Sequence, residues 1–117
     1  MQYLLLYDIE KLSRNILLKS YKNDGFKIIN ETDNYILIKK HNASIIDEDI
    51  YIKILNSYLK RTNITKKLNG KIIDLSPAFK YASKSIGFNK FDNKFEWYIR
   101  NIITKELNNI EITNNNN

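Results

Sequence analysis

Apolar residues follow two kinds of spacing along this chain, and each predicts one kind of element. Short runs that are apolar at consecutive or alternating positions predict β-strands at residues 3–9, 26–30 and 35–40. Between the first two runs, Leu12, Ile16 and Leu17 recur at helical spacing, and Gly25 is a natural stop for that helix. The first part of the chain therefore predicts strand, helix, strand, turn and strand.

A second helix is predicted to begin at Ser44, where Asp47 can return a capping interaction. The helix carries a wide apolar stripe, which we interpret as core packing, at Ile50, Tyr51, Ile54, Leu55, Tyr58 and Leu59. Gly70 then admits a tight turn into a strand over residues 71–75.

The last part of the chain fits two structures. Phe95, Trp97 and Ile99 alternate as in a strand, whereas the apolar positions over residues 97–107 also fit a helix. The length of the segment favours the helix, and the sequence alone leaves both open. Residues 110–112 predict a short last strand, and the Asn-rich residues 114–117 predict a disordered tail.

The composition limits the classes of function. The 117 residues contain no cysteine and one histidine, His41, which excludes thiolate and multi-histidine metal sites. No apolar run approaches the roughly 18 residues that a membrane span needs. There is no glycine-rich phosphate loop and no nucleophile motif. We therefore expect one domain with no enzymatic activity, no cofactor, no metal, no membrane association and no small-molecule substrate.

Positive charge is concentrated in the middle of the chain. The net charge is +6, and between residues 50 and 91 Asp74 is the only acidic residue among many lysines. A basic segment of this kind predicts a polyanionic partner, most simply nucleic acid. The abundance of Ile, Lys and Asn, with few arginines, indicates a very AT-rich genome, as in an organelle, a low-GC bacterium or a virus.

Residues 76–94 are predicted to form a long protruding loop that begins at the Ser76-Pro77 break. Lysines and aromatic residues are interspersed there, as expected of a segment that threads into folded RNA. The candidate RNA-binding residues of this loop are Lys80, Tyr81, Lys84, Phe88, Asn89, Lys90, Phe91 and Lys94. A second basic site is expected at the end of the preceding helix, at Lys60, Arg61, Lys66 and Lys67. The alternative is a flexible loop whose aromatic rings fold back on the core.

From His41 to Glu96 the sequence resembles the family of the tenth protein of the small ribosomal subunit. Leu75-Ser76-Pro77 stands where the family has a Pro-Leu-Pro turn, and Tyr81 enters the loop. Phe88-Asn89-Lys90 then matches a Val-Asn-Lys motif, and Phe95-Glu96 matches the closing Phe-Glu. The sequence departs from the family at Ser85-Ile86-Gly87, where the family has Ser-Pro-His, and in a shorter segment after the third strand.

The resemblance implies an α+β fold: a ferredoxin-like sheet with helices on one face and a long protruding loop. It implies that residues 35–113 form the domain, with residues 1–34 as an N-terminal extension. The implied function is that of a structural constituent of the small ribosomal subunit. Its partners would be small-subunit rRNA and the neighbouring ribosomal proteins of the subunit head.

The expected location is the mitochondrial matrix. Residues 1–10 look like neither a transit peptide nor a signal peptide, so such a protein would be encoded in the organelle. The cytoplasm of a low-GC bacterium or of a virus-infected cell is the alternative.

Two other classes of function stay open. The first strand, which ends in Tyr7-Asp8 before a helix and Gly25-Phe26, resembles the opening of the Cas2-like metal-dependent nucleases of ferredoxin-like fold. In that family Asp8 would hold a metal, although an aspartate here caps a helix equally well. The other class is a viral protein-interaction module, which would bind a protein partner and show little affinity for RNA.

Overall fold

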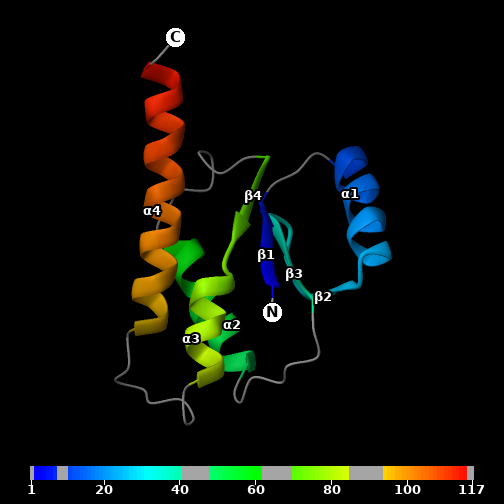
Figure 1. Ribbon diagram of the computed structural model, residues 1–117, viewed down its shortest axis with the longest axis horizontal. Coiled ribbons are helices and arrows are strands. Elements are labelled where there is room, and N and C mark those ends of the chain that lie inside the picture. The colour runs from blue at the N-terminus through cyan, green and yellow to red at the C-terminus, as the bar shows by residue number, and fades with distance from the viewer. Residues whose placement is uncertain (1, 8–10, 41–47, 62–69, 85–93, 116–117) are drawn as a thin grey trace.

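The computed structural model describes residues 2–7, 11–40, 48–61, 70–84 and 94–115. Within these ranges, one sheet contains β1 (Gln2–Tyr7), β2 (Phe26–Glu31), β3 (Tyr35–Lys40) and β4 (Lys71–Asp74). The helices are α1 (Lys11–Asn23), α2 (Glu48–Arg61), α3 (Ser76–Lys84) and α4 (Lys94–Asn115) (Figure 1). The predicted α+β class is confirmed. The strand order β2-β3-β1-β4, with antiparallel neighbours, is compatible with the predicted ferredoxin-like sheet.

β1 lies in the middle of the sheet. It pairs with β3 on one side, where Leu5 lies opposite Leu37, and with β4 on the other, where Leu5 lies opposite Ile73. All three side chains are fully buried. The predicted boundary at residue 34 therefore does not separate an extension from a domain, because β1 is the strand that joins β3 to β4.

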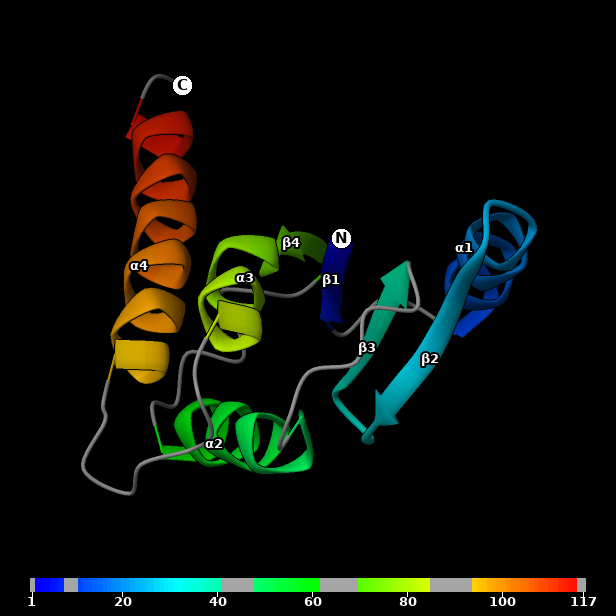
Figure 2. The same cartoon turned by 60° about the horizontal axis from the view of Figure 1, so that its bottom comes forward.

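Both faces of the sheet are apolar, and helices cover both. On the first face, Leu5 and Leu37 belong to a core that includes residues of α2, α3 and α4. On the second face, Leu6 and Ile36 pack with residues of α1. Figure 2 shows α1 on the opposite side of the sheet from α2, α3 and α4. The expectation that helices lie on one face is thus corrected for α1. Strands that are apolar at consecutive positions need cover on both sides.

Residues 76–84 form a helix, although the sequence predicted the start of a loop. Asp74 Oδ1 accepts a hydrogen bond from the Ser76 backbone N–H at 2.9 Å and another from the Ser76 hydroxyl. Pro77 is tolerated because a backbone N–H in the first turn of a helix has no acceptor within the helix, so its absence in proline costs no hydrogen bond. The buried side chains of the helix follow at helical spacing, at Ala78, Phe79 and Ala82. The loop prediction is wrong for this part, and residues 85–93 lie outside the described residues.

The ambiguous segment near the end of the chain is helical. Phe95, Ile99 and Ile103 repeat every four residues and are buried in the core on the first face of the sheet. The helical alternative for residues 97–107 is therefore confirmed. Because α4 continues to Asn115, the short strand predicted at residues 110–112 is wrong, and the helix includes the start of the predicted tail.

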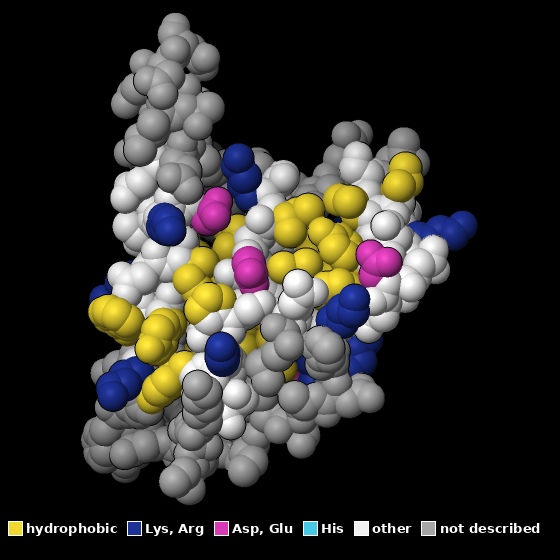
Figure 3. All heavy atoms as spheres, in the orientation of Figure 1, with side chains coloured by type: hydrophobic (Ala, Val, Ile, Leu, Met, Phe, Trp, Pro, Cys, Tyr) yellow, Lys and Arg dark blue, Asp and Glu magenta, His cyan; other side chains and the backbone are white. Residues whose placement is uncertain are grey.

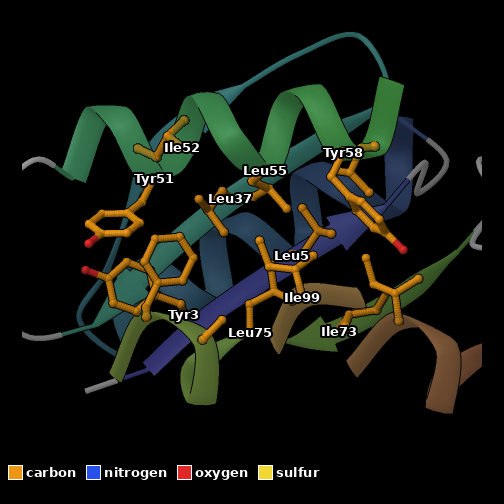
Figure 4. Close-up of a cluster of buried hydrophobic side chains, with 14 of the residues drawn as sticks. Tyr3, Leu5, Leu37, Tyr51, Ile52, Leu55, Tyr58, Ile73, Leu75 and Ile99 are labelled. Carbon is orange, nitrogen blue, oxygen red and sulfur yellow. The ribbon is translucent and has the colours of Figure 1, made fainter. Parts of the chain in front are cut away.

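A polar cluster joins the beginning of α2 to the sheet. Tyr3 Oη donates a hydrogen bond to Glu48 Oε2 at 2.7 Å, and Lys39 Nζ lies 3.0 Å from the same oxygen. Burial, and next the hydrogen bond to Glu48, raises the pKa of Tyr3 well above its ordinary value, so this phenol remains a donor. Figure 4 shows Tyr3 and Tyr51 at one end of the core, with Tyr58 at the opposite end.

Leu5→Ala should lower the free energy of unfolding by about 2–5 kcal/mol, because it leaves a cavity on the central strand. Unfolding by denaturant, followed by circular dichroism, measures the loss. Ile72→Ala on β4 is the control and should have a clearly smaller effect, because the Ile72 side chain is 41% exposed. Equal, small effects of both substitutions would contradict the central position of β1.

Candidate nucleic-acid interface

The residues predicted to bind RNA are distributed over three helices. Lys80 and Tyr81 lie on α3, Lys94 begins α4, and Lys60 and Arg61 end α2. Lys84 is the last residue of α3. The remaining predicted residues lie outside the described ranges, and these are Phe88, Asn89, Lys90, Phe91, Lys66 and Lys67.

Three aromatic rings form a row across α3 and α4. The ring centroid of Tyr81 lies 5.3 Å from that of Tyr98, which in turn lies 5.1 Å from that of Trp97. Tyr81 and Tyr98 are half-buried and pack against the core, whereas Trp97 is 56% exposed. We call these three residues the aromatic row. It leads from the core to an exposed indole on which a nucleic-acid base can stack.

Basic residues lie near the aromatic row. Lys94 and Arg100 precede and follow Trp97 by three residues, so each lies about one helical turn from it along α4. Both side chains are exposed, and so is that of Lys80, the neighbour of Tyr81 on α3. In Figure 3, hydrophobic side chains gather over the beginning of α4 and beside α3, with Lys or Arg side chains around them. Exposed cations beside an exposed ring suit single-stranded nucleic acid.

The second predicted basic site lies against α4. Arg61 forms an ion pair with Glu96, and its Nε also donates to the Ser57 carbonyl at 3.4 Å. The pair brings the end of α2 to the beginning of α4. It also partly neutralises Arg61, which weakens the contribution of this residue to a phosphate-binding surface. Lys60 is exposed and faces a different part of the molecule, a cleft at the end of the sheet.

This cleft has a volume of about 540 Å³ and lies where β1 ends and β2 turns into β3. One wall consists of Tyr7 and Tyr35, whose ring centroids are 5.9 Å apart and whose planes are inclined by 18°. The rest of the lining comes from the β2–β3 turn and from α2, at Thr32, Asp33, Asn34, Asn56, Leu59 and Lys60. Apart from Lys60, none of these residues was predicted from the sequence, because they come from three distant segments.

Trp97, Tyr98 and Arg100 were not among the residues predicted from the sequence. The helical alternative for this segment does indicate that Trp97 is exposed. At about 100° per residue, Trp97 lies about 200° from Phe95, the first buried residue of α4. The strand alternative places Phe95 and Trp97 on one face and so conceals the exposed indole.

Comparisons of the chain with protein-family models, curated proteins and solved structures found no match. In the part of the chain that the structure describes, no group of three or more Asp, Glu or His side chains could hold a metal ion. No helix of that part is long and apolar enough to cross a membrane. Asp8 and His41 lie outside the described ranges.

Proposed function

We propose that this protein binds RNA through the aromatic row together with Lys80, Lys94 and Arg100. The observation that carries the proposal is Trp97, an exposed ring with a basic residue one turn before it and one turn after it on α4. Cations attract the phosphates, and the indole stacks on a base largely without regard to its identity. Tyr98 packs against Trp97 with the ring planes at 80°, which holds the indole at the surface.

Among RNA-binding proteins, we propose a structural constituent of the small ribosomal subunit, in contact with rRNA and proteins of the subunit head. The order β3, α2 and β4 over residues 35–75 supports this, since the resemblance to the tenth small-subunit protein implies strand, helix, strand there. The net charge of +6 also supports it. The helix α3 departs from the family, because it stands where the Pro-containing turn leads into the loop. A mitochondrial or low-GC bacterial ribosome belongs to the same proposal.

Lys80→Ala should weaken binding to single-stranded RNA and reduce the slope of log affinity against log salt by about 0.7, the value for one phosphate contact. Fluorescence anisotropy of a labelled oligonucleotide at several salt concentrations measures both quantities. Lys19→Ala is the matched control, because Lys19 is exposed on α1, the helix that covers the other face of the sheet. An unchanged slope for Lys80→Ala would remove this residue from the interface.

The fluorescence anisotropy assay also tests the contribution of the Trp97 ring. Trp97→Ala should lower the affinity by about 1–3 kcal/mol with little change in the salt slope, because stacking involves no counterion release. Trp97→Phe keeps a ring and should retain part of the affinity. If Trp97→Ala binds as tightly as the unmodified protein, the aromatic row is not the RNA-binding surface.

The ribosomal setting is tested in the source cells. A tagged copy should sediment with the small subunit at low magnesium concentration, where the subunits separate, and should stay there through a moderate salt wash. The wash matters because a basic protein also adheres to ribosomes without specificity. Recovery only at the top of the gradient would contradict the ribosomal setting and leave RNA binding to the anisotropy assay.

A metal-dependent nuclease is a second candidate, favoured by the position of β1. This strand is central in the sheet and ends at Tyr7, so the chain leaves the middle of the sheet directly before Asp8. By its resemblance to the Cas2-like nucleases, Asp8 would hold the metal. If the candidate is correct, purified protein should cleave nucleic acid with Mg²⁺ or Mn²⁺, and Asp8→Asn should abolish cleavage while Asp24→Asn does not. Absence of cleavage with either metal, or full activity of Asp8→Asn, rejects it.

A further inference from the structure

We propose that the cleft between the β2–β3 turn and α2 binds a single unstacked ribonucleotide. The inference rests on the proposed RNA-binding function and names a second site for it, apart from the aromatic row. The lining combines aromatic rings, side-chain amides and one charge of each sign. These correspond to the three parts of a nucleotide that proteins recognise, namely the base, the ribose and the phosphate.

The aromatic wall is fixed by its surroundings. Tyr7 and Tyr35 are almost fully buried as residues, and they come from neighbouring strands that pair at this position. Tyr35 Oη accepts a hydrogen bond from Asn30 Nδ2 at 3.3 Å. Burial raises the pKa of Tyr35 to about 12, so its hydroxyl is neutral in the physiological range. The wall is therefore an uncharged, preorganised surface, and because Tyr7 is 1% and Tyr35 is 6% exposed, a base or a sugar can touch only a small part of it.

The amide groups are positioned for a base edge. Asn56 Oδ1 accepts a hydrogen bond from Asn30 Nδ2 at 3.0 Å, so the Asn56 Nδ2 group is the part of this amide that can donate to a ligand. Asn34 lies in the turn, where its backbone N–H and that of Tyr35 both donate to Thr32 Oγ1 at 3.2 Å. These bonds fix the turn that forms the rim of the cleft. Amides supply both donors and acceptors, which the edge of an unpaired base requires.

The two charges orient the nucleotide. Lys60 on α2 attracts the phosphate, and Asp33 in the turn repels it. The Asp33 carboxylate can instead accept hydrogen bonds from the ribose hydroxyls, and the 2′-hydroxyl is the group that distinguishes RNA from DNA. A volume of about 540 Å³ lies in the range of sites for small ligands. The cleft therefore suits one nucleotide with its sugar and favours ribose over deoxyribose.

Nuclear magnetic resonance of the ¹⁵N-labelled full chain tests the proposal with free AMP, GMP, CMP and UMP as probes. The side-chain amide signals of Asn34 and Asn56 should shift on addition of at least one ribonucleotide, and less with its deoxy form. Lys60→Ala should weaken binding about fivefold, the effect of one exposed charge contact. Lys53→Ala is the control, because Lys53 is exposed on α2 and does not line the cleft.

Asp33→Asn should remove the preference for ribose, since a neutral amide accepts more weakly from the hydroxyls than a carboxylate does. Asp24→Asn, outside the lining of the cleft, should preserve it. A short single-stranded RNA that competes with the mononucleotide identifies an extruded nucleotide of RNA as the source. Lack of competition identifies a free nucleotide. Absence of shifts with all four ribonucleotides, shifts at Trp97 and Tyr98 only, or unchanged affinity of Lys60→Ala, would overturn the proposal.

The experiments can reject the proposal for one site without rejecting the proposal for the other. Trp97→Ala and Lys80→Ala alter the aromatic row and should leave mononucleotide binding unchanged. Loss of oligonucleotide affinity in these variants, with no ribonucleotide binding anywhere, would reject the cleft and keep the row. Ribonucleotide binding in the cleft, with oligonucleotide affinity untouched by both variants, would reject the row and keep the cleft.

Discussion

The first strand must be covered on both faces and paired on both edges, and much of the structure follows from this requirement. Leu5 and Leu6 point to opposite faces because side chains alternate along a strand, and both are almost completely buried. Two separate layers of helices are therefore needed. α1 supplies one, and α2, α3 and α4 supply the other. The edges of β1 hold β3 and β4, so a short segment at the beginning of the chain connects elements from its whole length.

The aromatic row is a continuation of the core to the surface. Tyr3 stacks on Phe79 with ring centroids 4.0 Å apart, and Phe79 meets Phe95 at 5.2 Å. From the same two helices, Tyr81 and Tyr98 carry the sequence of rings outward to Trp97. The position of the exposed indole thus depends on packing that also stabilises the fold. A binding group supported in this way is held in place by rigid elements, as precise recognition requires.

The elements with clear periodicity were predictable, and the errors occur where distant contacts decide the structure. The strand at residues 35–40 was predicted with its observed bounds, and α1 ends before Gly25, whose φ is +95°. At Ser76-Pro77 the local sequence indicated a break. The helix forms there because Ser76 Oγ accepts a hydrogen bond from the Tyr3 N–H at 3.0 Å and because Phe79 is buried against Tyr3. No local pattern reveals contacts between residues so far apart in the sequence. The cleft could not be predicted for the same reason. Lys80 and Tyr81 could be named as candidate RNA-binding residues, because that prediction used only their neighbours in the sequence.

The ion pair between Arg61 and Glu96 connects the two proposed binding surfaces. Arg61 follows Lys60, which lines the cleft, and Glu96 precedes Trp97, which ends the aromatic row. The Arg61 side chain is 61% exposed and that of Glu96 is 20% exposed. An ion pair with an exposed partner contributes roughly 0–1 kcal/mol to stability, so its main effect is on the relative position of α2 and α4. Because the two charges of the pair largely cancel, Arg61 and Glu96 contribute little to the electrostatic potential around the protein. Lys60, Lys80, Lys94 and Arg100 are also exposed near the two surfaces. In the proposed function, this placement of positive charge, more than the total of +6, is what would direct an RNA strand to the rings.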